Sequence, residues 1–234
     1  MSWIHTVLDL LLPDTCVLCR APQNHRKPHL MCSYCWGALP RLVHGCPGCA
    51  LPLPSPGLCG RCQRKPLLSG VCIAGLRHEG DARSLVHQLK YAHDLRAGIT
   101  LAQVLSGAVT QSYADRALPQ CLIPVPLSYP RQVHRGFNQA AWLANCAARS
   151  LALPVNTSAV RRRHGRAQQT LSRRARLSLA ADTFSLGRKV DYQHVAIVDD
   201  VFTTGTTTAV LADMLRHSGI ATVDIWVAAR AIPD

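Results

Sequence analysis

The sequence predicts an α/β protein in which a mainly parallel β-sheet with flanking helices follows a small cysteine-rich module. After residue 70, short apolar segments alternate with longer amphipathic segments, which is typical of parallel strands joined by right-handed helical crossovers. Before that point, eight cysteines stand in four Cys-x-x-Cys pairs, and a Pro- and Gly-rich stretch at 51–70 ends the module. We therefore expect three parts, namely an N-terminal helix at 1–13, the cysteine-rich module at 14–70 and the sheet domain at 71–234.

The composition is that of a globular protein, with 48% hydrophobic and 17% charged residues in a chain of 234. No apolar run approaches the roughly 20 residues of a membrane span. Residues 1–13 are mostly apolar, but they include Asp9 and lack both a basic start and a small-residue cleavage site. This pattern predicts an amphipathic helix that packs on the body of a cytoplasmic protein.

The four Cys-x-x-Cys pairs predict two structural Zn²⁺ sites. Two intervening residues let both thiolates of a pair face one metal ion, and two pairs complete a tetrahedral site of four sulfurs. Sequential pairing would form a double zinc ribbon, whereas cross-braced pairing, the first pair with the third and the second with the fourth, remains compatible with the spacing. A disulfide framework is the alternative, which export would favour. The eight expected ligands are Cys16, Cys19, Cys32, Cys35, Cys46, Cys49, Cys59 and Cys62.

The sheet domain begins with a strand at 71–76 and two helices at 81–93 and 95–113. A second strand at 121–126 and a helix at 137–151 follow after short turns. Because the strands of such a sheet run parallel, their carboxyl ends meet at one edge, where ligands of this architecture bind. Residues that directly follow a strand are therefore the first candidates for a functional site.

Residues 195–207 carry the most functional information in the chain, and they read Val-Ala-Ile-Val-Asp-Asp-Val-Phe-Thr-Thr-Gly-Thr-Thr. Four apolar residues predict a buried strand, Asp199 and Asp200 close its carboxyl end, and a Thr- and Gly-rich turn leads into a helix at 206–217. Backbone N–H groups and hydroxyls at a helix N-terminus suit a phosphate monoester. Carboxylates suit sugar hydroxyls and Mg²⁺ instead. The pattern favours a ribose 5-phosphate ligand over the alternative, a buried strand that ends in a solvated acidic turn.

The charge of the chain is strongly basic, with 26 Lys and Arg against 13 Asp and Glu. Residues 116–181 contain eleven arginines and no carboxylate, and seven of these arginines fall within 161–176. Such an excess indicates an anionic partner, either a diphosphate or a nucleic acid, while a solvated basic face is the alternative. Few aromatic residues lie near the basic stretch, so the sequence shows no platform for stacking bases.

The stretch 195–207 resembles the phosphoribosyl-diphosphate (PRPP) signature of type I phosphoribosyltransferases, and the whole chain resembles the ComF family, in particular its GntX branch. The segments that carry the wider resemblance are the cysteine pairs, His-Gln-Leu-Lys-Tyr at 87–91, Pro-Val-Pro-Leu at 124–127, Arg131, Arg-Gly-Phe-Asn-Gln at 135–139 and the stretch 161–176. Members of that branch are linked to natural competence or to the use of external DNA as a nutrient. The resemblance implies a type I phosphoribosyltransferase-like domain that binds PRPP with Mg²⁺, without implying a defined reaction.

The same resemblance implies roles for individual residues. Asp199 and Asp200 would hold the ribose hydroxyls and Mg²⁺. The 5-phosphate would be held by Thr203, Thr204, Gly205, Thr206 and Thr207. Cations for the diphosphate would come from Lys90, Arg131 and Arg135, and from Arg161, Arg163, Arg174 and Arg176 in a hood that closes over the ligand, although Gly165 and Leu179 depart from the hood pattern. Asn138 and Gln139 could either bind ligand or cap the following helix.

Three functions are compatible with these patterns. The first is an enzyme that transfers the phosphoribosyl group to a nitrogen nucleophile, with Arg135, Asp199 and Asp200 as its catalytic residues. The second is a sensor that binds PRPP without turnover. The third is a zinc-ribbon protein that binds single- or double-stranded DNA through the arginines of 161–176 and uses the sheet domain as a scaffold. Other DNA-uptake proteins are further expected partners.

Overall fold

The computed structural model describes residues 15–23, 30–65, 69–127, 135–162, 183–187 and 191–232. The N-terminal helix predicted at 1–13 lies outside this range. So do most of the arginine-rich stretch 161–176, including the predicted ligand-binding residues Arg163, Arg174 and Arg176, and the separate predicted ligand-binding residue Arg131.

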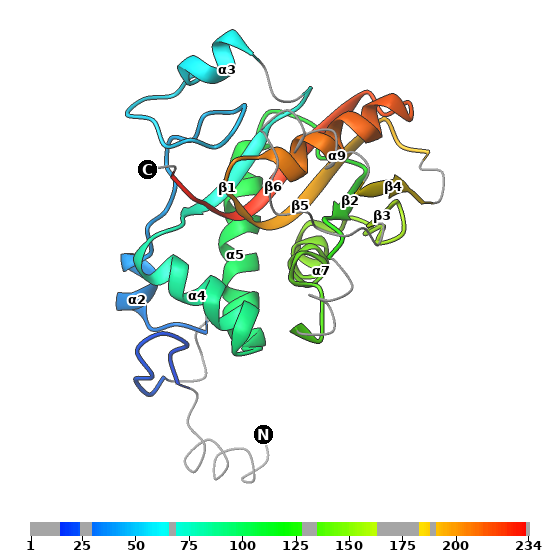
Figure 1. Ribbon diagram of the computed structural model, residues 1–234. Helices are drawn as coiled ribbons and strands as arrows, with labels where there is room; N and C mark the ends of the chain where they lie inside the picture. The colour runs from blue at the N-terminus through cyan, green and yellow to red at the C-terminus, as the bar shows by residue number, and fades with distance from the viewer. Residues whose placement is uncertain are drawn as a thin grey trace, which may run out of the picture.

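A four-stranded parallel sheet forms the centre of the larger domain (Figure 1). Its strands are β1 (Cys72–Arg77), β2 (Cys121–Pro124), β5 (His194–Phe202) and β6 (Thr222–Arg230), in the order β1-β6-β5-β2. All three neighbouring pairs of strands run parallel. The predicted α/β class with a mainly parallel sheet is therefore confirmed, although β6, a central strand, was not predicted.

Helices cover both faces of the sheet (Figure 1). Helices α4 (Gly80–Tyr91), α5 (Leu95–Ser112) and α7 (Gln139–Leu151) lie on one face, and α9 (Thr206–His217) lies on the other. Side chains of β5 alternate between the two apolar layers, as successive residues of a strand must. Ala196 and Val198 pack with α4, α5 and α7, whereas Val195 and Ile197 pack with α9.

The cysteine-rich module covers the outer edge of β1. The described residues of the module include the short helices α2 (Ser33–Ala38) and α3 (Gly60–Arg64). Backbone bonds join the module to the strand, with the N–H of Leu42 donating to Gly75 O at 3.2 Å and the N–H of Cys72 donating to Pro47 O at 2.7 Å. These contacts satisfy part of a strand edge that would otherwise be open to another chain.

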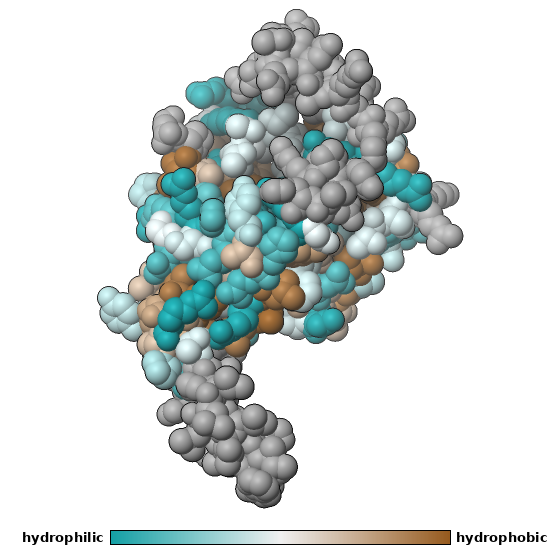
Figure 2. Space-filling view, turned by 60° about the horizontal axis from the view of Figure 1, so that its bottom comes forward, coloured by the Kyte–Doolittle hydropathy of each residue, from teal (hydrophilic) through white to brown (hydrophobic). Residues whose placement is uncertain are grey.

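A separate two-stranded antiparallel sheet consists of β3 (Val160–Arg162) and β4 (Phe184–Leu186), and β4 contacts α9. Neither strand was predicted. On the face seen in Figure 2, hydrophobic side chains occur in several separate groups among hydrophilic ones. No helix in the described part of the chain is both long and apolar enough to cross a membrane.

Candidate functional site

The eight paired cysteines gather into two clusters of four. Cys16, Cys19, Cys32 and Cys35 form the first cluster, and Cys46, Cys49, Cys59 and Cys62 form the second, with the sulfurs of each cluster within 4.8 Å of one another. The sequential pairing is thus the one that the chain adopts, and the cross-braced alternative is wrong. All eleven cysteines are free thiols, which also rules out the disulfide alternative.

The spacing of the sulfurs fits zinc. The Sγ atoms of Cys19 and Cys32 are 3.8 Å apart, and those of Cys49 and Cys59 are 3.7 Å apart. A tetrahedron with Zn–S bonds of about 2.3 Å has edges of about 3.8 Å. Each site offers four sulfur ligands, which complete the tetrahedral coordination of a zinc ion and leave no position open for water or substrate. Zinc bound there is therefore structural.

One thiol in each cluster is acidic. Burial acts to raise the pKa of Cys16, but backbone N–H groups, including that of Cys32, outweigh it and lower the pKa to about 6. The pKa of Cys59 falls to about 7 for a similar reason, because the N–H of Cys62 and neighbouring thiols outweigh burial. Both clusters therefore offer a thiolate, the form that binds metal, near neutral pH.

The two adjacent carboxylates lie inside β5 and do not close it. The strand continues to Phe202 because β6 pairs alongside it past this point, with Val201 opposite Ala229. The expectation that the strand ends at the acidic pair is corrected accordingly. Because successive side chains alternate, Asp200 lies on the face of α4 and Asp199 on the face of α9.

Asp200 forms an ion pair with Lys90, a predicted ligand of the diphosphate. Its Oδ1 lies 2.8 Å from Nζ of Lys90, which is near the carboxyl end of α4. Both side chains are largely buried, with 12% of Asp200 and 18% of Lys90 exposed. Lys90 is thus at the acidic pair and neutralises one of its two carboxylates.

Asp199 titrates near neutral pH. Removal from water and the neighbouring Asp200 raise the pKa of this carboxyl from 3.8 to about 7, although the N–H of Asp200 and the charge of Lys90 act in the opposite direction. The N–H of Asp200 donates to Asp199 Oδ1 at 2.9 Å. A cation or a hydrogen-bond donor placed here would favour the ionised form.

The turn after β5 leads directly into the N-terminus of α9. Gly205 precedes the helix with φ of 77°, and a Cβ on it would lie 2.3 Å from Cζ of Phe202, so both conformation and packing require glycine. The hydroxyls of Thr204 and Thr206 are 3.0 Å apart, and Thr204 is exposed. The turn therefore presents hydroxyls, and the positive end of a twelve-residue helix, to solvent.

Two segments that are distant in sequence meet beside this edge. The guanidinium of Arg135 lies 5.3 Å from the centre of the Tyr91 ring, and its Nη1 donates to Gln139 Oε1 at 3.3 Å. Tyr91 directly follows Lys90. The motifs 87–91 and 135–139 are thus in contact, and Arg135 is held by stacking and by one hydrogen bond.

Asn138 acts as the cap of α7. Its Oδ1 accepts bonds from the N–H groups of Ala140 at 3.0 Å and Ala141 at 3.3 Å, while its Nδ2 donates to Val125 O at 3.0 Å. The second contact fixes the cap to the segment that follows β2. Of the two roles considered for Asn138, the described contacts favour capping.

Arg161 lies on β3, where its side chain is exposed and outside the central sheet. Two residues at the carboxyl edge of that sheet were not predicted, His78 and Arg230. Burial and the charge of Lys90 lower the pKa of His78, which leaves the imidazole neutral at pH 7. Arg230 is buried at the end of β6. The position of His78 directly after the first predicted strand was a signal available in the sequence, whereas Arg230 had none because β6 was not predicted.

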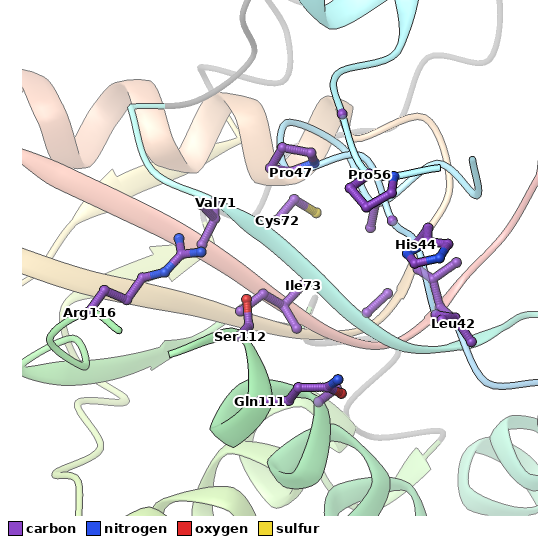
Figure 3. A pocket seen from close by; sticks show the side chains of 16 residues that line it. Leu42, His44, Pro47, Pro56, Val71, Cys72, Ile73, Gln111, Ser112 and Arg116 are labelled. Atoms are coloured by element: carbon purple, nitrogen blue, oxygen red, sulfur yellow. The ribbon is translucent and has the colours of Figure 1, made fainter. Parts of the chain in front are cut away.

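A cavity of about 370 Å³ lies elsewhere, between the second zinc cluster, β1 and the carboxyl end of α5. Figure 3 shows Cys72, His44, Gln111 and Arg116 among its lining residues. None of the residues from 199 to 207 lines it. The candidate anion site is therefore the open turn before α9 and not this cavity.

A comparison with family models agrees with the two cysteine clusters. The family model described as "Double zinc ribbon domain" matches residues 7–63. The DNA utilization protein YhgH of Salmonella typhimurium is 34% identical over 229 residues, which cover 95% of this chain and 100% of the relative. Competence protein F of Haemophilus influenzae is 32% identical over 223 residues, which cover 86% of this chain and 96% of the relative.

Among solved structures, a purine phosphoribosyltransferase from Pyrococcus horikoshii aligns with 57% of this chain and 76% of its own, with 17% identity and a TM-score of 0.32. The relatives with curated names align over far more of the chain. Their identity and coverage confirm the family predicted from the sequence. The chain belongs to the family of the DNA utilization protein YhgH and competence protein F.

Proposed function

We propose that this protein binds PRPP with Mg²⁺ at the carboxyl edge of its sheet and works in the cytoplasm in the uptake or use of external DNA. The observation that carries the proposal is the continuity of β5, which bears Asp199 and Asp200, with the exposed turn at the N-terminus of α9. The names of its relatives support the DNA-related role.

In the proposed complex, the turn residues Thr203, Thr204, Gly205, Thr206 and Thr207 hold the 5-phosphate. Backbone N–H groups at the start of α9 and the threonine hydroxyls supply the donors that a phosphate needs. Asp199 and Asp200 accept hydrogen bonds from the ribose hydroxyls and hold Mg²⁺, whose charge offsets that of the diphosphate. Asp199 gives up its proton as the ligand binds, since its pKa is raised to about 7.

Cations complete the proposed site. Arg135 contacts the diphosphate from its position on Tyr91, and Lys90 adds a charge next to Asp200. We assign Arg131, Arg161, Arg163, Arg174 and Arg176 to the same ligand. If turnover occurs, diphosphate leaves and a nitrogen nucleophile takes its place at the sugar carbon, with Arg135 stabilising the negative charge of the leaving group.

Calorimetry tests the binding proposal. Zinc-loaded protein is titrated with PRPP in the presence of Mg²⁺, beside the double variant Asp199→Asn/Asp200→Asn. Asp213→Asn is the matched control, because Asp213 is an exposed carboxylate on α9, beyond the turn. We expect micromolar binding by the wild type and the control, and loss of binding by the double variant. Equal binding by all three proteins would contradict the site.

A diphosphate-release assay with candidate nitrogenous bases separates an enzyme from a sensor. DNA binding is measured separately, with single- and double-stranded oligonucleotides over a range of salt concentrations. If the protein is a sensor, PRPP changes its affinity for DNA and releases no diphosphate. If the sheet domain is only a scaffold, DNA binding persists in the double variant, and replacing the arginines of 161–176 abolishes it.

A further inference from the structure

Arg230 connects two regions that are distant in the sequence. Only 3% of this residue is exposed, and its guanidinium reaches both the second zinc cluster and the turn before α9. Its Nε donates to Cys49 O at 2.9 Å. Its Nη1 donates to Phe202 O at 3.0 Å and to Thr203 O at 2.7 Å. Cys49 belongs to the zinc cluster, and Phe202 and Thr203 begin the turn.

The contacts of Arg230 are to backbone carbonyls. No carboxylate forms an ion pair with it in the described part of the chain, although an unpaired buried charge is costly. The carbonyl oxygens therefore supply the compensation, including that of Ala231. Because the guanidinium is planar and its donors point in fixed directions, it holds these carbonyls in a fixed arrangement.

Arg230 also acts on Gly205, the glycine of the turn, through the ring of Phe202. The guanidinium of Arg230 lies 4.9 Å from the centre of the Phe202 ring. The same ring packs so closely on Gly205 that no Cβ would fit there. The position of Phe202 thus sets the path of the turn, and Arg230 holds both the ring and the carbonyl of Phe202.

The first zinc cluster has different neighbours. Thr15, next to Cys16, accepts a hydrogen bond from Arg96 of α5, and Arg20 lies 3.9 Å from Asp94, the residue that caps α5. These contacts lead to the start of α5, on the face of the sheet opposite α9, and not to the turn. The two clusters therefore differ in what they support.

We propose that Arg230 is a positioning residue that couples the second zinc site to the turn of residues 203–207. Zinc holds the Cys49 knuckle, the knuckle holds Arg230, and Arg230 holds the start of the turn in the shape that receives a phosphate. The structural coupling between the zinc site and the turn does not depend on the proposed function. Only the effect of PRPP on zinc binding rests on the proposal that PRPP is the ligand. Since coupling between sites is reciprocal, a ligand in the turn also stabilises zinc in the second site.

Hydrogen exchange measures the coupling without any ligand. The zinc-loaded full chain is compared with Arg230→Met and Arg230→Lys. Arg77→Met is the matched control, because Arg77 lies opposite Arg230 in the register of β1 and β6 but pairs with Glu79 at the surface, at 3.0 Å. We expect the amides of 203–207 to exchange about tenfold faster in Arg230→Met, since several bonds to a charged donor are lost.

In the same experiment Arg230→Lys has an intermediate effect, because lysine keeps a charge but has fewer, undirected donors. The control leaves the turn unchanged, and protection in β5 remains high in all proteins. Turn exchange in Arg230→Met equal to that in the control would overturn the coupling.

Two zinc-site variants test the proposal even if Arg230→Met does not fold. Cys59→Ser, in the second cluster, is expected to speed exchange in the turn, whereas Cys19→Ser, in the first cluster, leaves it unchanged. Equal effects of the two variants would overturn the selectivity of the coupling.

The reciprocal effect is measured as zinc release to a chromophoric chelator. Once calorimetry shows PRPP binding, PRPP should slow release from the second site in the wild type and slow it less in Arg230→Lys, because coupling between sites is reciprocal. Unchanged release in the wild type would contradict the coupling. Failure of PRPP to bind at all would contradict the proposed function, while the exchange result would still decide the role of Arg230.

Discussion

Nζ of Lys90 lies 2.8 Å from Oδ1 of Asp200, so an ion pair joins the end of α4 to the strand that carries the acidic pair. The partners are 110 residues apart in the chain, as their numbers show, and both are largely buried. The charge of Lys90 acts to lower the pKa of the neighbouring Asp199 and so offsets part of the repulsion between the two carboxylates.

Loss of the lysine charge is expected to destabilise the protein. Lys90→Met leaves a buried carboxylate without its partner, and we expect the free energy of unfolding to fall by about 2 kcal/mol, less than for a fully buried pair because part of the pair reaches solvent. Chemical denaturation measures the change. Lys65→Met, at an exposed position after α3, serves as the control and should change the stability little. Equal stability of Lys90→Met and the wild type would show that the ion pair contributes nothing.

The raised pKa of Asp199 predicts a dependence of stability on pH. The folded protein binds this proton more tightly than the unfolded chain, whose carboxyl titrates near 3.8, while the folded value is about 7. The stabilising contribution is therefore complete below pH 3.8 and is lost as the pH rises to about 7. Asp199→Asn should remove this part of the pH dependence, as measured by thermal unfolding between pH 5 and about 8.

The same titration affects ligand binding if the proposed site is correct. Affinity for PRPP with Mg²⁺ should rise between about pH 6 and pH 8, because the ionised carboxylate binds the ligand. Calorimetry at pH 7 in two buffers of different ionisation enthalpy should detect proton release. Binding heats that are independent of the buffer would show that Asp199 does not titrate on binding.

Local sequence patterns predicted the parts of the fold that local forces determine. The helix at 206–217 has the predicted bounds, because a glycine at its start and an amphipathic pattern define it. The strand β6 was missed because a charged residue, Asp224, falls within an otherwise apolar run. Asp224 is buried, but it accepts hydrogen bonds from the N–H of Val71 at 2.6 Å and from the hydroxyl of Tyr113. Such compensation comes from distant residues and is invisible locally.

In the candidate site, too, features formed by contiguous residues were predicted and features formed by distant residues were not. The Asp-Asp pair and the Thr- and Gly-rich turn were visible because all their residues are contiguous. The ion pair of Lys90 with Asp200 and the bridging role of Arg230 depend on how β5 and β6 lie beside α4 and the zinc module. Lys90 was predicted only as a cation that binds the diphosphate. Nothing in the local sequence distinguished Arg230 from the other arginines.

The sequential pairing of the cysteines predicts the zinc content of double variants. Cys19→Ser/Cys32→Ser alters one cluster twice, so the protein should keep one zinc per chain. Cys19→Ser/Cys49→Ser alters both clusters, so both ions should be lost or bound weakly. Atomic absorption on the purified proteins measures the content. A cross-braced protein would give the reverse result, with both ions lost from the first variant and one retained by the second.

Gly205 is required for two separable reasons, its positive φ and its contact with Phe202. Gly205→Ala should lower the free energy of unfolding by about 3 kcal/mol, because the methyl group displaces the Phe202 ring in addition to straining the backbone. Gly219→Ala is the matched control, since Gly219 also has a positive φ, 103°, but its Cβ would meet nothing within 4 Å. That variant carries the backbone strain alone, and we expect a loss of about 1 kcal/mol. Urea denaturation of both proteins measures the difference, and equal losses would show that the Phe202 contact does not constrain the turn.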